Sequence, residues 1–149
     1  MYKVTYLFLS CIISFNCFSN ESIVFLKETS NGSSLVLLDV DTTKEKLIDV
    51  GNLKVIYPTI SSNGKTIAFS GSKDSKNWGI YTYEIKSKKI IQVIPEHGLT
   101  IQPSFSGNGN KLAFTAPVLG KNQIHILDYK KWVNDNQKKI KVINSEKAA

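Results

Sequence analysis

The chain of 149 residues has the length of one domain, and its 42% hydrophobic and 21% charged residues are typical of a globular protein and exclude a largely disordered one. Its net charge of +7 comes from lysine alone, because the sequence contains no arginine. Arginine makes most bidentate contacts to phosphate and guanine, so this composition argues against a nucleic-acid-binding protein.

The N-terminal residues predict a secretory signal peptide. An apolar run at residues 4–15 is shorter than the roughly 20 residues that a membrane-spanning helix needs. The small residues Cys17 and Ser19 then fit the small-x-small cleavage pattern, which places the cut between Ser19 and Asn20. Residues 1–19 are therefore expected to be the signal peptide.

Cysteine usage agrees with this interpretation. Both cysteines, Cys11 and Cys17, lie in the signal segment, so residues 20–149 contain none. A mature chain without cysteine has no disulfide, no thiolate metal site and no cysteine nucleophile. We expect an exported domain that its apolar core holds together, most simply in the periplasm, with secreted and lipid-anchored forms as the alternatives.

The mature chain repeats itself at a period of 44–45 residues. The segment YPTISSNGKTIAFS at residues 57–70 recurs as QPSFSGNGNKLAFT at residues 102–115, and a weaker third copy places Phe25 in phase. The recurring positions are Pro58, Gly64 and Phe69, then Pro103, Gly109 and Phe114. A period of this length with short strands inside each unit is typical of a β-propeller.

Alternating apolar residues predict short strands in every repeat, and the Asn-Gly pair at Asn63 predicts a hairpin turn because both residues tolerate a positive φ. The strands are expected at residues 22–27, 34–41 and 45–50, then 57–61, 66–70, 79–85 and 89–94, and finally 102–106, 111–115, 123–129 and 139–143. No helix is expected in the mature chain. The predicted fold is all-β: an incomplete propeller of about three antiparallel, four-stranded blades at residues 21–50, 57–94 and 102–144, the first lacking its inner strand.

The two hairpin segments resemble the repeat of the TolB-like β-propellers, whose signature is roughly Pro-x-Trp-Ser-Pro-Asp-Gly-x-x-Ile-Ala-Phe. The resemblance covers residues 21–144. Ile60 and Phe105 stand at the position of the Trp, and Asn63 and Asn108 replace the Asp, which keeps the turn chemistry. The resemblance implies one four-stranded blade per repeat.

The family namesake is a periplasmic partner of the Tol–Pal envelope system, with an N-terminal α/β domain and about six blades, the usual range for closed propellers being 4–8. The resemblance therefore implies binding to a protein, a peptide or another envelope component, and membrane association only through such partners. Three blades are too few for a closed ring. The chain is expected to be either part of a longer propeller or completed by a partner, and a homodimer would supply six blades.

Other members of the family precede serine peptidase domains. No Gly-x-Ser-x-Gly elbow occurs in this chain, so we expect no catalytic residues and no enzyme. The acids Asp39, Glu84 and Asp128 recur at the repeat period, which places each in a different blade. They are interpreted as turn and strand-end hydrogen-bonding residues rather than metal ligands, and neither a metal nor a cofactor is expected.

Lysines gather at the turn that leads into the outermost strand of each blade. They are Lys44, Lys46, Lys86, Lys88, Lys89, Lys130, Lys131, Lys138 and Lys139. Charges at such a turn protect an exposed sheet edge from pairing with other chains. A basic rim that contacts anionic lipid or polysaccharide is the alternative.

Function in propellers is expected in the less patterned loops, at residues 29–32, 51–56, 71–78, 95–101 and 116–122. Their residues with recognition chemistry, the candidate binding site, are Tyr57, Asp74, Trp78, Glu96 and His97. Trp78 either contacts a partner or caps the core, and His125 is expected to be a packed or hydrogen-bonded strand residue. The leading hypothesis is a non-enzymatic binding module. A glycan-binding or hydrolytic module that uses Trp78 and His97, and a fragment without independent function, are the alternatives.

Overall fold

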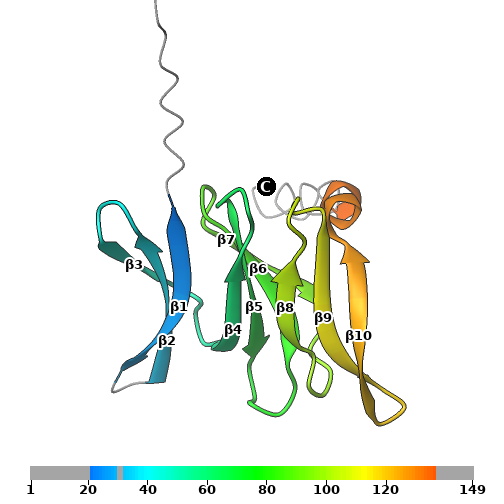
Figure 1. Cartoon of the computed structure of the whole chain (residues 1–149). Coiled ribbons are helices and arrows are strands. Elements are labelled where there is room, and N and C mark those ends of the chain that lie inside the picture. Colours follow the sequence, from blue (N-terminus) through cyan, green and yellow to red (C-terminus); the bar gives the residue numbers. More distant parts are fainter. Residues whose placement is uncertain (1–20, 30–31, 137–149) are drawn as a thin grey trace, which may run out of the picture.

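The computed structural model describes residues 21–29 and 32–136, and these form three separate antiparallel sheets that stand side by side (Figure 1). The first sheet contains β1 (Ser22–Thr29), β2 (Gly32–Asp39) and β3 (Lys44–Ile48). The second contains β4 (Lys54–Ile60), β5 (Thr66–Ser72), β6 (Gly79–Glu84) and β7 (Lys89–Ile94). The third contains β8 (Ile101–Phe105), β9 (Lys111–Val118) and β10 (Lys121–Asp128).

These sheets are called blades 1, 2 and 3 below. The strand orders β1-β2-β3, β4-β5-β6-β7 and β10-β9-β8 confirm the predicted incomplete β-propeller. Each predicted strand within the described residues is present, with its bounds shifted by a few positions. Blade 1 has three described strands, of which β1 corresponds to β5 and β9. The predicted last strand at residues 139–143 lies outside the described part of the chain.

The expectation that the mature chain has no helix was wrong, because residues 129–136 are helical. Asp128 starts this helix as its N-cap: a side-chain oxygen of Asp128 accepts a hydrogen bond from the backbone N–H of Lys131 at 3.0 Å. Tyr129 stacks on Trp132 with ring centroids 6.2 Å apart and meets Phe105 edge-on at 5.5 Å. The predicted strand at residues 123–129 ends one residue too late, because Tyr129 belongs to the helix. Its ring anchors the helix on blade 3.

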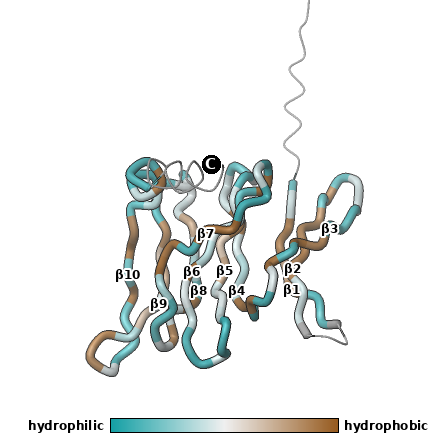
Figure 2. Tube along the Cα trace, turned by 180° about the vertical axis from the view of Figure 1, so that it is seen from behind, coloured by the Kyte–Doolittle hydropathy of each residue, from teal (hydrophilic) through white to brown (hydrophobic). Residues whose placement is uncertain are grey.

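The core lies between the blades, because successive side chains of a strand point to opposite faces of its sheet. Phe69 and its neighbours on one face of blade 2 pack against Leu35 and Ile48 of blade 1. Ala68 and Ile80 on the other face pack against blade 3. Figure 2 shows hydrophobic stretches along the strands and mostly hydrophilic turns, with the β9–β10 turn as an exception.

The three in-phase phenylalanines were expected to be core residues between blades. Phe69 is completely buried and Phe114 is 8% exposed, as predicted. Phe25 is only half-buried, so the prediction was wrong for this residue. Its register is the predicted one, since Phe25 pairs with Val36 as Phe69 pairs with Tyr81. The difference arises because, among the described residues, no further sheet packs on that face of blade 1.

The predicted Asn-Gly turn is held by a small network of hydrogen bonds. The Ser61 hydroxyl donates to the Asn63 side-chain oxygen at 2.8 Å and accepts the N–H of Thr66 at 3.0 Å. Gly64 has a φ of +65°, a conformation that glycine adopts without strain. The same bonds recur from Ser106 to Asn108, at 2.9 Å, and to the N–H of Lys111, at 3.0 Å, beside Gly109 at +69°. Asn therefore keeps the turn chemistry in both repeats.

Candidate functional site

The three blades have a turn end and a loop end. The turn end carries the repeated turns after β2, β4, β6 and β8 together with helix 129–136, at the top of Figure 1. The loop end carries the β5–β6 loop at residues 73–78 and the β7–β8 loop at residues 95–100, at the bottom of Figure 1. These two loops contain four of the five predicted site residues.

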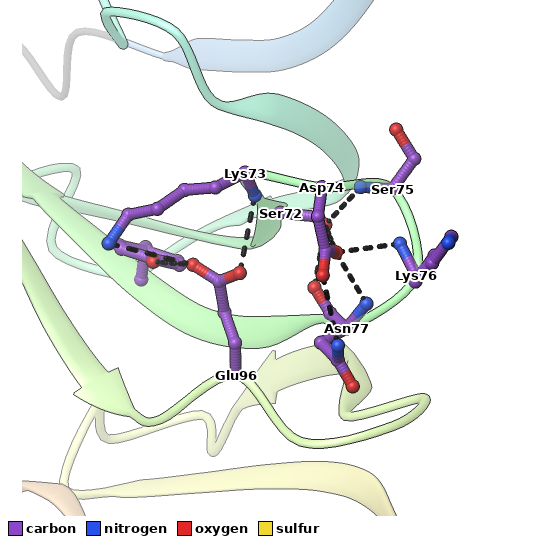
Figure 3. A network of polar contacts seen from close by, with 8 residues as sticks. Ser72, Lys73, Asp74, Ser75, Lys76, Asn77 and Glu96 are labelled. Atoms are coloured by element: carbon purple, nitrogen blue, oxygen red, sulfur yellow. Dashed lines mark hydrogen bonds and ion pairs between the residues drawn. The ribbon is translucent and has the colours of Figure 1, made fainter.

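Asp74 organises the β5–β6 loop from within (Figure 3). One of its carboxylate oxygens accepts the backbone N–H groups of Lys76 and Asn77, both at 2.7 Å, and the other accepts the Asn77 side-chain amide at 2.9 Å. These hydrogen bonds hold the pKa of Asp74 well below its usual range. Ser72 adds a second brace, because its hydroxyl donates to the Asn77 carbonyl at 2.6 Å and accepts the N–H of Ser75 at 2.8 Å.

Glu96 connects the second loop to the first loop and to β6. One of its carboxylate oxygens accepts the Tyr81 hydroxyl at 2.6 Å, and the other accepts the backbone N–H of Lys73 at 3.2 Å (Figure 3). The Glu96 side chain is only 15% exposed, and the Lys73 ammonium lies 4.0 Å from it. Burial, together with the hydrogen bond and the negative charge of Glu96, raises the pKa of Tyr81 above its usual range.

Backbone hydrogen bonds join the two loops directly. The N–H of Trp78 donates to the Gly98 carbonyl at 2.8 Å, and the N–H of His97 donates to the Trp78 carbonyl at 3.0 Å. The N–H of Gly98 also donates to the Asn77 side-chain oxygen at 3.2 Å. Residues 73–78 and 95–100, called the joined loops below, therefore form one hydrogen-bonded unit.

Glycines allow this close approach. A Cβ on Gly79 would lie 2.6 Å from the Ile94 carbonyl oxygen, and a Cβ on Gly71 would lie 2.6 Å from the ring of Tyr81. Real Cβ atoms do not approach other atoms so closely, so neither position accepts a larger residue without moving its neighbours. The Tyr81 ring can therefore lie over β5, which places its hydroxyl against Glu96.

The joined loops use the predicted residues in different ways. Asp74 and Glu96 shape and connect the loops, whereas His97 is exposed to solvent. Trp78 is half-buried, so part of its surface is accessible to a partner. Tyr57 lies apart from the loops, within β4, at a bulge where its φ is +52° and its side chain is 48% exposed.

Three contributors to the site were not singled out from the sequence. Tyr81 and Asn77 hold the loops together, and Leu99 is 50% exposed between His97 and the buried Thr100. Tyr81 could have been found from the repeat itself. Its counterparts in the other blades, at the same pairing register, have no phenol hydroxyl: one is Val36 and the other is His125.

The recurring acids accept hydrogen bonds at the ends of their strands, as expected. Asp39 accepts the N–H and hydroxyl of Thr42, both at 2.8 Å, which lowers the pKa of Asp39. Asp128 caps the helix, and the Glu84 carboxylate accepts the Ser87 hydroxyl. Within the described residues, no group of three or more His, Cys, Asp or Glu side chains is placed to hold a metal ion.

Two further expectations concern residues outside the joined loops. His125 is packed as predicted, stacked on Phe114 with ring centroids 5.5 Å apart. The described turn-end lysines, from Lys44 to Lys131, are exposed, and Lys138 and Lys139 lie outside the described residues. An open groove of about 1130 Å³ lies at the turn end, between the edge of blade 1 and the Asn63 turn of blade 2.

Comparisons with known proteins rest on the fold. No family model and no curated protein matches the sequence. The structure of TolB from Acinetobacter baumannii matches with a TM-score of 0.64 at 19% identity, over 74% of this chain and 29% of that one. A TolB-type protein from Agrobacterium tumefaciens matches with a TM-score of 0.63 at 15% identity, over 73% of this chain and 42% of that one.

The fold is that of the TolB-like β-propellers. The same fold is seen in the β-propeller domain of the Trilobed protease from Pyrococcus furiosus, with a TM-score of 0.55 at 20% identity, over 72% of this chain and 34% of that one. The chain therefore spans between 29% and 42% of the length of these three structures. In residues 21–29 and 32–136, no helix is long and apolar enough to cross a membrane.

Proposed function

We propose that the chain is a non-enzymatic, exported TolB-like propeller module that binds a protein or peptide partner, or another envelope component, through the joined loops. The observation that carries this proposal is the hydrogen bonding of the two loops to each other. Backbone bonds between Trp78, His97 and Gly98 hold the loops in one arrangement before any partner arrives. A surface ordered in advance loses less conformational entropy on binding.

The exposed side chains of the joined loops support recognition of a protein or peptide. Leu99 is 50% exposed next to the exposed His97 and the half-buried Trp78. Tryptophan is among the residues most enriched at the energetic centre of protein interfaces. The proposed contact surface is therefore the loop end of blade 2, at Trp78, His97 and Leu99.

The chemistry of the two carboxylates supports binding over hydrolysis. Asp74 already accepts hydrogen bonds from Lys76 and Asn77, and Glu96 accepts them from Tyr81 and Lys73. A general acid or base must be within reach of a substrate proton, and these groups instead point at the loop itself. In the hydrolytic alternative built on Trp78 and His97, neither Asp74 nor Glu96 would therefore serve as the general acid or base.

The binding test compares matched surface variants. We expect Trp78→Ala and Leu99→Ser to reduce capture of envelope proteins by the immobilised chain by roughly tenfold, as the loss of interface anchors does. Leu119→Ser is the control, because Leu119 is 98% exposed on the β9–β10 turn. Equal capture by all variants, with unchanged circular dichroism, would contradict a site on the joined loops.

The proposed export has its own test. The signal peptide and its cleavage between Ser19 and Asn20 lie outside the described residues. We expect N-terminal sequencing of protein from the periplasmic fraction to begin at Asn20. A periplasmic form that still begins at Met1 and contains Lys3 would refute cleavage, and a chain found only in the cytoplasm would refute export.

A further inference from the structure

The outer surface of blade 3 carries apolar side chains that the same repeat positions bury in blade 2. Ile124 and Ile126 of β10 are 79% and 69% exposed. Their counterparts in β6 are Ile80 and Thr82, which are 0% and 1% exposed. The pairing register fixes this correspondence, because Ile126 pairs with Ala113 as Thr82 pairs with Ala68. Blade 3 covers Ile80, whereas no described sheet covers Ile124.

The opposite surface of blade 1 shows the complementary situation. Ile23 of β1 is 51% exposed, and Phe25 is half-buried. Their counterparts in blade 3 are Leu112 and Phe114, which are 0% and 8% exposed and pack against blade 2. The register again fixes the match, because Ile23 pairs with Leu38 as Leu112 pairs with Leu127.

The molecule thus displays both halves of its own blade–blade interface. The front face of blade 1 is defined by Ile23 and Phe25, and the back face of blade 3 by Ala113, Ile124 and Ile126. We propose that the front face of one copy docks on the back face of a second copy and repeats the contact between blades 2 and 3. Phe25 then lies against Ile124 as Phe114 lies against Ile80 within the chain.

Two properties of these faces favour a second copy over an unrelated partner. The residues that define both faces are apolar, as in the buried centre of a stable interface, and on the same side of blade 1 the Lys27–Glu45 ion pair lies beside them. The apolar positions of each face also match positions that already pack within this chain, although Lys27 stands where blade 3 packs Ala116 and β8 of blade 3 has no described counterpart in blade 1. The faces differ from one another, so the contact is head-to-tail and either closes into a ring or continues into longer assemblies. The described residues of two copies provide six blades, within the usual 4–8 of closed propellers.

The first experiment measures the mass of the full chain in solution by sedimentation or light scattering. A dimer of the 16.6 kDa chain, or a larger head-to-tail assembly, is expected. Phe25→Lys and Ile124→Lys should each weaken association by roughly tenfold or more, because each buries a charge in an apolar contact. Leu119→Lys is the matched control, since Leu119 is 98% exposed on the turn beside β10, and it should leave the mass unchanged.

A second experiment identifies which faces meet, and it does not depend on the lysine variants. Cys11 and Cys17 are first replaced by serine, and Phe25→Cys and Ile124→Cys are then made in separate chains. A disulfide-linked dimer should form when the two variants are mixed, and only weakly when either is oxidised alone. A monomeric wild type, including one whose back face its own residues 137–149 cover, would overturn the proposal. So would an assembly that both lysine variants leave intact.

Discussion

Side-chain hydrogen bonds shape both ends of blade 2, but only the network at its turn end is repeated in blade 3. At the turn end, Ser61, Asn63 and Gly64 form a hydrogen-bonded turn that blade 3 repeats at nearly the same distances. At the loop end, Asp74 and Asn77 form an equally well-bonded loop, and the β9–β10 turn of blade 3 has no counterpart to it. The network that blades 2 and 3 share belongs to the repeat. The network of the β5–β6 loop is a feature of blade 2 alone among these two blades.

The largest expected effect comes from removing the core that supports both ends. Phe69 is fully buried and stacks on Tyr81 with ring centroids 5.9 Å apart. Phe69→Ala should lower the free energy of unfolding by about 3–5 kcal/mol, because it leaves a cavity between blades 1 and 2. Urea denaturation measures this change. Leu119→Ala, at a residue that is 98% exposed, should cost less than about 0.5 kcal/mol. A similar small cost for Phe69→Ala would contradict the inter-blade core.

A smaller effect should separate the two ends. Glu96→Ala leaves the Tyr81 hydroxyl and the N–H of Lys73 without their acceptor, at a cost of about 1–3 kcal/mol. Hydrogen exchange should become faster in the joined loops and stay unchanged at the Asn63 turn. Glu96→Gln keeps an acceptor oxygen and should restore part of the protection. Equal acceleration at both ends would show that the ends are not independent.

Matched glycine substitutions test whether the turn end is truly periodic. Gly64 and Gly109 have φ values of +65° and +69°, and a Cβ at either position meets no atom within 4 Å. Gly64→Ala and Gly109→Ala should therefore each cost about 1–2 kcal/mol, from backbone strain alone. Thermal unfolding of the two variants should give equal shifts. A large difference between the two shifts would mean that the two turns do not contribute equally to stability.

The smallest effect is a pH dependence of the β5–β6 loop relative to the Asn63 turn of the same blade. The folded pKa of Asp74 lies below its ordinary value of 3.8, so the ionised form stabilises the loop. That contribution is present above pH 3.8 and is lost as the pH falls below 3.8 toward the folded pKa. The protection factors of the Lys76 and Asn77 amides, which correct for the intrinsic pH dependence of exchange, should stay constant from neutral pH down to this point and then fall relative to those of the Asn63 turn. Asp74→Asn should remove the dependence, and its persistence in that variant would assign it to another group.

The sequence predicted the features that repeat between blades and missed the features that occur in one blade only. The repeat of Pro58, Gly64 and Phe69 predicted blades, turns and buried rings, because each of these residue types has a local conformational or packing reason to recur. The helix at residues 129–136 was missed because it depends on one cap, Asp128, and on aromatic stacking by Trp132. The acid itself recurs as Asp39, whose side chain accepts the N–H of Thr42 in a turn, so the acid alone did not distinguish a helix cap from a turn.

The candidate site divides in the same way. The sequence placed Asp74, Trp78, Glu96 and His97 in loops, because each lies outside the alternating pattern of the strands. It could not show that the carboxylate oxygens of Asp74 and Glu96 accept hydrogen bonds from the loops themselves and from Tyr81. That outcome depends on which N–H and hydroxyl groups the folded chain brings within hydrogen-bond distance, across 23 positions in the case of Lys73 and Glu96.

The sequence by itself determined the propeller architecture, because a 44–45-residue repeat of apolar alternation and Asn-Gly turns encodes strand and turn geometry locally. Only the tertiary structure decided which equivalent residues are buried. Ile80 and Ile124 occupy the same repeat position, yet one is 0% and the other 79% exposed. Burial depends on which neighbouring sheet packs on a face. The type of a side chain at a repeat position does not show whether its blade has such a neighbour.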